Sequence, residues 1–270
     1  MSFLPDEQLT KDELTWISAR NMGALVSVQP LKLALSNEVF LLTFSNGQKT
    51  VFKRLNQTVR DPHDRSCELR VHQLANDAGF TPKVLVCNAL YQLQEYFPGD
   101  VLSNSPLTSQ TLKQLALQLT KIHQLPAVHA RPQRLAASLR QLKEKTDKPV
   151  DAAVFSRILN RAIALDNSSP KNCLCHGDLS LNNLLINDRQ QIKILDWEYA
   201  ALACPAYDLA SCICINALNT LQQEALLREY YLLNKEHLSR SLVVLQQECS
   251  VYLTVFDYLN ALWANCFIAD

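Results

Sequence analysis

The chain has 270 residues, of which 48% are hydrophobic, so it can bury a large core as one domain or as two tightly packed lobes. Its 26 basic and 26 acidic residues balance, which argues against a broad charged surface for nucleic acid or for an anionic membrane. The first residues lack the regions of a secretory signal, and no apolar run reaches membrane-spanning length. We therefore expect a cytoplasmic protein without a nucleic-acid or membrane partner.

The first half of the chain is predicted to form a small lobe rich in strands. An amphipathic pattern over residues 64–75 predicts one helix, which ends near Gly79. The Pro98-Gly99 pair stops the last strand, so we expect an N-terminal lobe over residues 1–97 and a C-terminal lobe over residues 98–270. Alternating and β-branched runs predict strands over residues 39–44, 50–55, 82–86 and 91–97.

The second half is predicted to be mainly helical. Two short apolar segments, 184–186 and 192–195, flank a polar turn and predict a hairpin, a small island of strand inside a helical lobe. The predicted fold class is therefore α+β, with a small antiparallel sheet and one helix in the first lobe and a larger helical second lobe. The expected helices cover residues 111–125, 132–146, 150–165, 207–218, 220–233 and 242–267.

The nine cysteines do not form an obvious metal or disulfide pattern. The closest pairs, Cys173/Cys175 and Cys212/Cys214, lack Cys-x2-Cys spacing. Without a secretory signal, this favours reduced thiols packed as small apolar residues. The alternative is a zinc site built from Cys173, Cys175 and His176, although zinc clusters usually contain paired Cys-x2-4-Cys knuckles.

The most informative segment covers residues 175–199 and contains the polar groups that phosphoryl transfer to a hydroxyl requires. That reaction needs a carboxylate to orient the hydroxyl and accept its proton, and oxygen ligands to hold Mg²⁺ on the phosphates. Asp178 can serve as the carboxylate, and Asn183 and Asp196 as the ligands. The spacing His-x-Asp-x4-Asn, which begins at His176, matches the kinase catalytic loop.

The predicted hairpin strengthens this interpretation. Because a hairpin folds back on itself, it returns Asp196 to the neighbourhood of Asn183, which is the geometry that two ligands of one metal need. Each of these residues taken alone is equally well explained as a solvated polar group of a loop. Their combination favours the metal site.

A strand lysine followed by a helix glutamate would complete a nucleotide site. Lys53 lies at the end of the second strand and Glu68 on the next helix, the arrangement with which kinases hold the α- and β-phosphates. The alternative is an ordinary pair of surface residues. Backbone groups of Glu95, Tyr96 and Phe97 follow where the connector between the lobes should hydrogen-bond adenine, although an edge strand that ends in a turn explains them equally well.

The chain resembles the group of choline/ethanolamine kinases, thiamine kinases and aminoglycoside phosphotransferases, and the resemblance covers most of it. It implies a two-lobed protein-kinase-like fold with ATP in the cleft, Asp178 as the catalytic base, and Asn183 and Asp196 as Mg²⁺ ligands. The segments that carry it are Leu35-Ser36-Asn37-Glu38-Val39, Val51-Phe52-Lys53, Arg65-x-x-Glu68, Gln94-Glu95-Tyr96-Phe97-Pro98-Gly99, His176-Gly177-Asp178-x4-Asn183 and Ile194-Leu195-Asp196-Trp197-Glu198-Tyr199-Ala200.

The first loop departs from the family pattern. Where the family often has glycines, this chain has Leu33 and Ala34, and Gly-x-Gly-x2-Gly occurs nowhere. Ser36 and Asn37 can still present backbone N–H groups to phosphate in a turn, but with less freedom to approach it. We therefore expect a modest ATP affinity.

The acceptor is predicted to be a small molecule. Only about ten residues separate Asp196 from the next helix, too few for the activation segment with which protein kinases dock peptides. Aromatic and acidic groups nearby favour a cationic acceptor through cation–π and charge contacts, although core packing is the alternative for the aromatic ones. The candidate acceptor contacts are Glu198, Tyr199, Asp208 and Trp263, with Trp197 and Tyr207 as further aromatic groups.

Three functions remain open at this point. The first is an ATP-dependent kinase for thiamine, choline or ethanolamine. The second is an aminoglycoside or sugar phosphotransferase, which should need a more acidic pocket. The third is a nucleotide-binding pseudokinase that serves as an interaction module. The sequence leaves the oligomeric state open.

Overall fold

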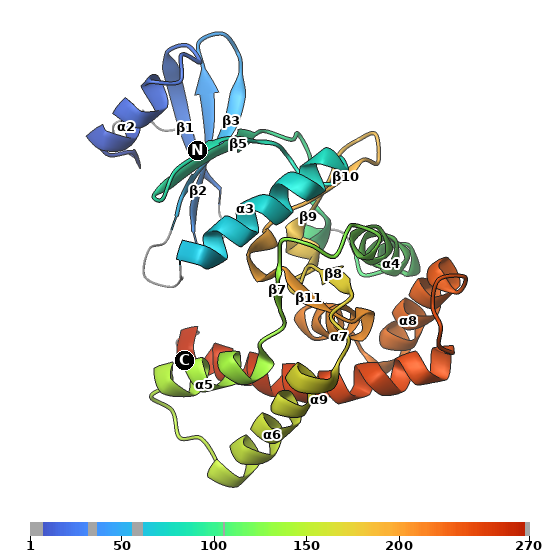
Figure 1. Ribbon diagram of the computed structural model, residues 1–270. Helices are drawn as coiled ribbons and strands as arrows, with labels where there is room; N and C mark the ends of the chain where they lie inside the picture. The colour runs from blue at the N-terminus through green and yellow to red at the C-terminus, as the bar shows by residue number, and fades with distance from the viewer. Residues whose placement is uncertain (1–7, 32–36, 56–61, 105, 268–270) are drawn as a thin grey trace.

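The computed structural model describes residues 8–31, 37–55, 62–104 and 106–267, which form two lobes (Figure 1). The N-terminal lobe contains one antiparallel sheet with the strand order β1-β2-β3-β5-β4. Its strands are β1 (Leu25–Leu31), β2 (Glu38–Phe44), β3 (Lys49–Arg54), β4 (Val84–Cys87) and β5 (Tyr91–Glu95). Four of these strands were predicted, whereas β1 was not.

Two helices accompany this sheet. The predicted helix is α3 (Pro62–Asp77). The unpredicted helix α2 (Lys11–Ser18) begins with a capping box, in which Thr10 and Glu13 satisfy each other's backbone N–H groups. The α2 helix is fixed to the sheet because Glu13 pairs with Arg54 of β3 at 2.5 Å and Ile17 is buried in the core of this lobe.

The C-terminal lobe is mainly helical, as predicted, and α9 runs across the lobe with α6 below it in the view of Figure 1. The predicted helix over 132–146 begins later, at Leu135, because Arg131 and Pro132 form the short strand β7. The helices are α4 (Ser109–His123), α5 (Leu135–Lys145), α6 (Ala152–Ser168), α7 (Pro205–Ile215), α8 (Thr220–Asn234) and α9 (Leu242–Phe267).

The helical lobe contains more strand than the sequence predicted. The expected hairpin is present as β9 (Leu184–Ile186) and β10 (Ile192–Ile194), and β6 (Asp100–Val101) extends it to three strands. A second small sheet has the order β7-β11-β8, with β8 (Cys173–Cys175) and β11 (Ala201–Ala203). The prediction of a single island of strand was therefore wrong. The missed strands are only two or three residues long and are defined by tertiary pairing rather than by a local pattern.

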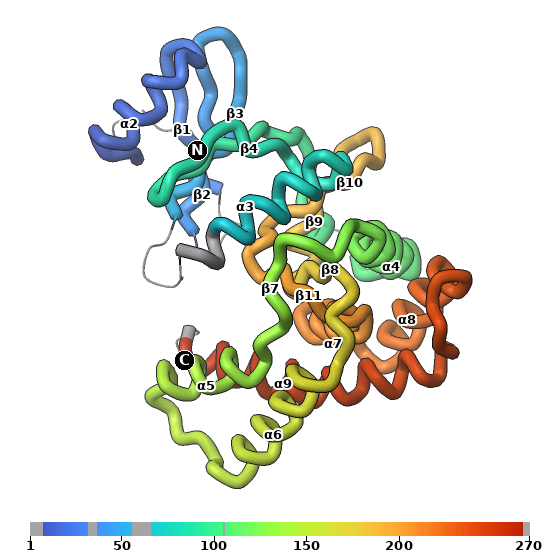
Figure 2. Tube along the Cα trace, viewed as in Figure 1, coloured from blue at the N-terminus to red at the C-terminus, as the bar shows by residue number. Residues whose placement is uncertain are grey.

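Contacts from the N-terminal half fix the position of the β9–β10 hairpin, which lies beside the end of α3 (Figure 2). The Ile194 amide donates to the Phe80 carbonyl at 2.7 Å, and the Lys193 ammonium donates to the Gly79 carbonyl at 2.7 Å. Gly99 packs so closely on β9 that a Cβ there would lie 2.7 Å from the Ile186 carbonyl oxygen. The segment between the lobes is therefore anchored at this hairpin.

Each lobe has its own hydrophobic core. The core of the sheet includes Phe44 and Phe52, whereas Val71 and Ala75 of α3 belong to the larger core of the helical lobe. Among the described residues, no helix combines the length and the apolar character needed to cross a bilayer.

Candidate active site

The predicted catalytic loop leaves β8 through a buried histidine. The His176 ring contacts the Trp197 ring at 4.9 Å, its Nε2 lies 2.9 Å from the Leu195 carbonyl, and its Nδ1 lies 3.2 Å from the Asp178 amide. A neutral imidazole satisfies both bonds, with Nε2–H donating and Nδ1 accepting. Burial lowers the pKa of His176, which favours this neutral form. His176 therefore shapes the loop, as predicted.

Asp208 of α7 anchors the start of the loop through its carboxylate. Its carboxylate accepts the His176 amide and the Gly177 amide, each at 2.8 Å, and lies 3.1 Å from His123 Nε2. The side chain is fully buried. Burial opposes the charged form, but the bonds from His123 and the neighbouring His176 hold the pKa of Asp208 below its usual value. The prediction that Asp208 contacts the acceptor was wrong, because its carboxylate is enclosed and used by the loop.

Ser211 of α7 and Asn216, the residue that follows this helix, also hydrogen-bond the same loop. Ser211 Oγ donates to the Gly177 carbonyl at 2.6 Å. Asn216 accepts the Leu181 amide at 2.9 Å and donates to the Leu179 carbonyl at 3.0 Å. The backbone of the catalytic loop is therefore bonded to α7 and to its C-cap residue at four positions, His176, Gly177, Leu179 and Leu181.

Asp178 and Asn183 meet at the end of the loop. Asn183 Nδ2 donates to Asp178 Oδ2 at 3.0 Å and to the Asp178 carbonyl at 2.8 Å. Burial raises the pKa of Asp178 to about 7, and the Asp196 carboxylate adds to this shift by repulsion. A carboxyl group with a pKa near neutrality suits a general base.

The hairpin returns Asp196 to this place. The Leu195 amide donates to the Asn183 carbonyl at 2.8 Å. Asp196 is the next residue in the chain, so this bond holds the two candidate ligands near each other. Asp196 adopts a left-handed backbone (φ 60°, ψ 74°), a costly conformation for a residue other than glycine and one often found at functional sites.

These residues fit a hard divalent cation. Asp178 and Asp196 repel each other, and the amide nitrogen of Asn183 is engaged with Asp178, which leaves its carbonyl oxygen Oδ1 as the donor for a metal. Carboxylate and amide oxygens are the ligands that Mg²⁺ prefers in proteins. A cation would also relieve the repulsion between the two carboxylates.

Of the remaining predicted acceptor residues, Glu198 and Tyr199 lie beside the catalytic loop, whereas Trp263 packs against the helical core. A Cβ on Gly177 (φ 77°) would lie 2.4 Å from the Tyr199 carbonyl oxygen, so the segment that carries Glu198 and Tyr199 packs directly on the catalytic loop. The Tyr199 side chain is 51% exposed. Trp263 of α9 is half-buried and packs against the core of the helical lobe.

The two further aromatic candidates belong to the interior. Trp197 and Tyr207 are both buried, and Tyr207 packs on the rings of Tyr252 and Phe256 at 5.9 and 5.2 Å. Core packing, the alternative interpretation of these residues, is therefore the one that the structure supports.

On the nucleotide side, Lys53 lies on β3 and Glu68 on α3, as predicted. The buried His72, one helical turn after Glu68, lies near both Lys53 and Asp196. Burial lowers the pKa of His72 to about 4, with the Lys53 charge adding to the decrease and the Asp196 charge opposing it. His72 of α3, Lys53 of β3 and the candidate metal ligand Asp196 therefore lie near one another. The pairing of Lys53 with Glu68 stays a prediction.

The predicted adenine contacts lie at the end of β5 and in the segment that follows it. The Glu95 amide already donates to the Lys83 carbonyl at 2.9 Å, so it is not available to adenine. The Lys49 ammonium lies over the Tyr96 ring, 5.6 Å from the ring centroid, and Phe97 is half-buried. Leu33, Ala34 and Ser36 of the predicted phosphate loop lie outside the described residues, and Asn37 is the first residue described after them.

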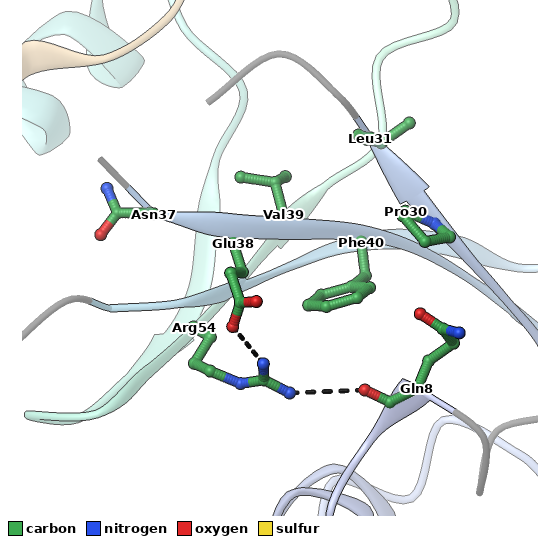
Figure 3. Close-up of a pocket in the computed structure, with 8 residues that line it drawn as sticks. All are labelled: Gln8, Pro30, Leu31, Asn37, Glu38, Val39, Phe40 and Arg54. Atoms are coloured by element: carbon green, nitrogen blue, oxygen red, sulfur yellow. Dashed lines mark hydrogen bonds and ion pairs between the residues drawn. The ribbon is translucent and has the colours of Figure 1, made fainter. Parts of the chain in front are cut away.

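A hollow of about 330 Å³ lies on the N-terminal lobe beside β1, β2 and the end of β3, and Gln8 also lines it (Figure 3). Asn37 lines it at one end, and the Arg54 side chain, which also lines it, pairs with Glu38 and donates to the Gln8 carbonyl at 3.4 Å. No residue of the catalytic loop lines this hollow. It is therefore distinct from the candidate reaction site at Asp178, Asn183 and Asp196.

Five residues of the site were missed by the sequence analysis or given another role: His72, His123, Asp208, Ser211 and Asn216. Asp208 and Ser211 stand three residues apart within the otherwise apolar helix α7, so they share one helical face. Two polar groups on one face of a buried helix are a signal for a polar partner, which here is the backbone of the loop. His72 and His123 gave no comparable local signal.

A family model described as the phosphotransferase enzyme family matches residues 27–239, well over half of the chain. The chain belongs to this family. It is 29% identical over 202 residues to a protein LicA homolog of Metamycoplasma hominis, an alignment that covers 69% of this chain and 79% of that protein. It is 28% identical over 237 residues to the thiamine kinase of Escherichia coli O157:H7, with 85% of this chain and 79% of that protein covered.

A third relative is probable choline kinase 1 of Arabidopsis thaliana, with 27% identity over 213 residues. The match covers 72% of this chain but only 61% of the plant protein. Among solved structures, choline kinase LicA from Streptococcus pneumoniae has a TM-score of 0.70 at 18% identity, with 94% of this chain and 89% of that chain covered. The predicted kinase-like fold and the class of small-molecule phosphotransferases are thereby confirmed.

Proposed function

We propose that this phosphotransferase moves the terminal phosphoryl group of ATP, with Mg²⁺, to the hydroxyl of a small cationic metabolite. The observation that carries the proposal is the junction of Asp178, Asn183 and Asp196, in which Asn183 bonds Asp178 and the hairpin returns Asp196 to Asn183. Asp178 orients the acceptor hydroxyl and takes its proton. Asn183 and Asp196 hold the Mg²⁺, which supplies positive charge to the phosphates.

The N-terminal lobe, residues 1–97, is proposed to bind the nucleotide. Lys53 lies on the strand that pairs with β5, and β5 leads into the proposed adenine contacts of Glu95, Tyr96 and Phe97. Because the Glu95 amide is engaged, its carbonyl and the backbone of the next two residues are the proposed adenine partners. Ser36, Asn37 and Glu68 complete the proposed nucleotide set.

The acceptor is proposed to be a cationic alcohol of the kind that thiamine and choline represent. The relatives include a thiamine kinase and a probable choline kinase, and both of those substrates carry a permanent positive charge beside a primary hydroxyl. Tyr199 offers an exposed aromatic ring next to the loop, and Glu198 offers a carboxylate beside it. Trp263 is a weaker candidate, since its ring also packs against the core.

The test is ADP release from MgATP across a panel of thiamine, choline, ethanolamine, homoserine, methylthioribose and kanamycin. We expect turnover with a cationic alcohol in the wild type and its loss in Asp178→Asn, a matched control of nearly the same shape. Turnover only with the neutral sugar methylthioribose would contradict the cationic acceptor but not the phosphotransferase site. Turnover only with kanamycin, a polycation, would favour the aminoglycoside phosphotransferase alternative over a small cationic metabolite. Nucleotide binding without ADP release on any member would favour the pseudokinase alternative.

A further inference from the structure

A second group of metal-ligating side chains lies in the helical lobe, beneath the catalytic loop. It consists of His123 at the end of α4 and of Cys173 and Cys175 on β8, whose ligand atoms all lie within 4.8 Å of one another. All three side chains are almost fully buried. The cluster differs from the zinc site considered from the sequence, because His176 turns toward Leu195 and Trp197 while His123 takes its place.

The local structure explains why these three residues meet. Alternate residues of a strand face the same side, so Cys173 and Cys175 both project from one face of β8. The end of α4 packs on that strand, where Cys173 Sγ lies 3.9 Å from the His123 carbonyl. The two thiols also contact each other, and their further contacts are to carbonyl oxygens at 3.5–3.9 Å, which are weak bonds that a metal can replace.

The donor set is soft, in contrast to the oxygen donors of the candidate magnesium site. Thiolate sulfur and imidazole nitrogen select Zn²⁺ or similar ions, whereas Mg²⁺ prefers oxygen. Bonds of about 2.3 Å to sulfur and about 2.0–2.1 Å to nitrogen, at tetrahedral angles, separate the ligand atoms by about 3.5–3.8 Å. The present separations exceed this by about 1 Å at most, a difference that rotation of the side chains can remove.

We propose that His123, Cys173 and Cys175 form a buried binding site for Zn²⁺ or a similarly soft metal ion. This site is separate from the phosphotransferase centre and does not depend on its chemistry. Each thiol releases its proton to solvent as the thiolate binds the metal. Three protein ligands leave a fourth position for water or for another donor.

Metal binding at this site is coupled to the support of the catalytic loop. Both ring nitrogens of His123 are engaged, Nε2 with Asp208 at 3.1 Å and Nδ1 with the Tyr230 hydroxyl at 2.8 Å. Whichever nitrogen binds the metal must give up its present partner. Occupancy of the site therefore weakens one of the contacts that hold Asp208 and α8 in place.

The experiment uses the full chain, freed of metal under reducing conditions and titrated with Co²⁺ as the spectroscopic probe. We expect one equivalent of Co²⁺ with a sulfur-to-cobalt charge-transfer absorption that Zn²⁺ displaces. Cys173→Ser and Cys175→Ser should each weaken Co²⁺ binding by at least about tenfold, since even the loss of an outer contact of a metal ligand costs that much. Cys249→Ser, at an equally buried cysteine of the same core, is the matched control and should bind as the wild type does.

Absence of the charge-transfer band from the wild type, or its persistence in the Cys173→Ser Cys175→Ser double variant, would overturn the proposal. If the serine variants fail to fold, X-ray absorption at the zinc edge of the wild-type complex decides the question, with two sulfur ligands expected and a shell of only nitrogen and oxygen contradicting the site. Loss of ADP release in the panel assay leaves this result untouched, so the two proposals fail separately.

Discussion

The catalytic loop and the segment that follows Asp196 pack directly on each other, yet they are held in different ways. The loop is bonded to α7 through buried polar groups, with Asp208 fully enclosed, whereas Tyr199 of the following segment is half exposed. Buried charged contacts fix a geometry strongly because breaking them leaves an unpaired group. The difference indicates that the loop is held rigidly, whereas the proposed acceptor contact, Tyr199, lies at an exposed surface.

The largest effect is expected at the candidate metal ligands. Asp196→Ala should abolish turnover that depends on Mg²⁺, because it removes a charged oxygen ligand. Asn183→Ala should be milder and partly restored by raised Mg²⁺ or by Mn²⁺. The measurement is ADP release as a function of metal concentration, and turnover that persists in EDTA would contradict both assignments.

Asp178→Asn tests the proposed base. We expect kcat to fall by at least ~10²-fold, the usual effect of losing a general base, while ATP binding changes little. Steady-state kinetics and nucleotide titration of the same preparation separate the two effects. Near-normal turnover would remove Asp178 from the proton transfer and leave it only its bond to Asn183.

Asp208→Ala tests whether the rigidity of the catalytic loop depends on the buried carboxylate. It leaves His123 and the amides of His176 and Gly177 without their partner, so the free energy of unfolding should fall by about 3–5 kcal/mol. Urea denaturation measures this. Asp147→Ala, at an exposed position, is the control and should lie within about 0.5 kcal/mol of the wild type. Equal stability of the two variants would refute the role of Asp208.

The pH dependence of kcat/KM is a further test of the buried Asp178 in the catalytic loop. Asp178 acts in its ionised form, and its pKa is raised to about 7, so kcat/KM should fall as the pH drops through this region, about tenfold per unit well below it. Mg²⁺ offsets the Asp196 charge and favours the ionised form, so the midpoint should move to lower pH as Mg²⁺ increases. Rate profiles at two Mg²⁺ concentrations test this, and a midpoint that rises with Mg²⁺ would contradict it.

The smallest effect is expected on the exposed side. A cation–π contact at an exposed site contributes about 0.5–1 kcal/mol, so Tyr199→Ala should raise the acceptor KM by about two- to fivefold and leave the ATP KM unchanged. Tyr199→Phe keeps the ring and is the matched control. If the alanine variant spares a cationic acceptor, the ring is not part of its pocket.

The sequence predicted the local geometry of the candidate catalytic motif well because its parts are close in the chain. The spacing from His176 to Asn183 is local, and the β9–β10 hairpin that returns Asp196 is defined by apolar segments around a polar turn. Long helices such as α9 were predicted for the same reason, since their periodicity extends over many residues.

What the sequence did not reveal depends on contacts between distant segments. Asp208 was predicted as a charge partner of the acceptor because it is one of the acidic groups that could hold a cation, yet α7 turns it inward to His123, which lies 85 residues earlier. The short strands β7, β8 and β11 form only because the chain brings them together. A local pattern contains no record of such partners.

Gly99 has a mechanical consequence. The chain passes between the lobes at this residue, in close contact with the Ile186 carbonyl, and β6 then pairs with β9. A hinge motion that opens or closes the lobes would therefore pivot at the hairpin that joins the two candidate metal ligands. A pivot moves least, so the lobes could swing apart to exchange nucleotide while the metal ligands stay in register with the catalytic loop.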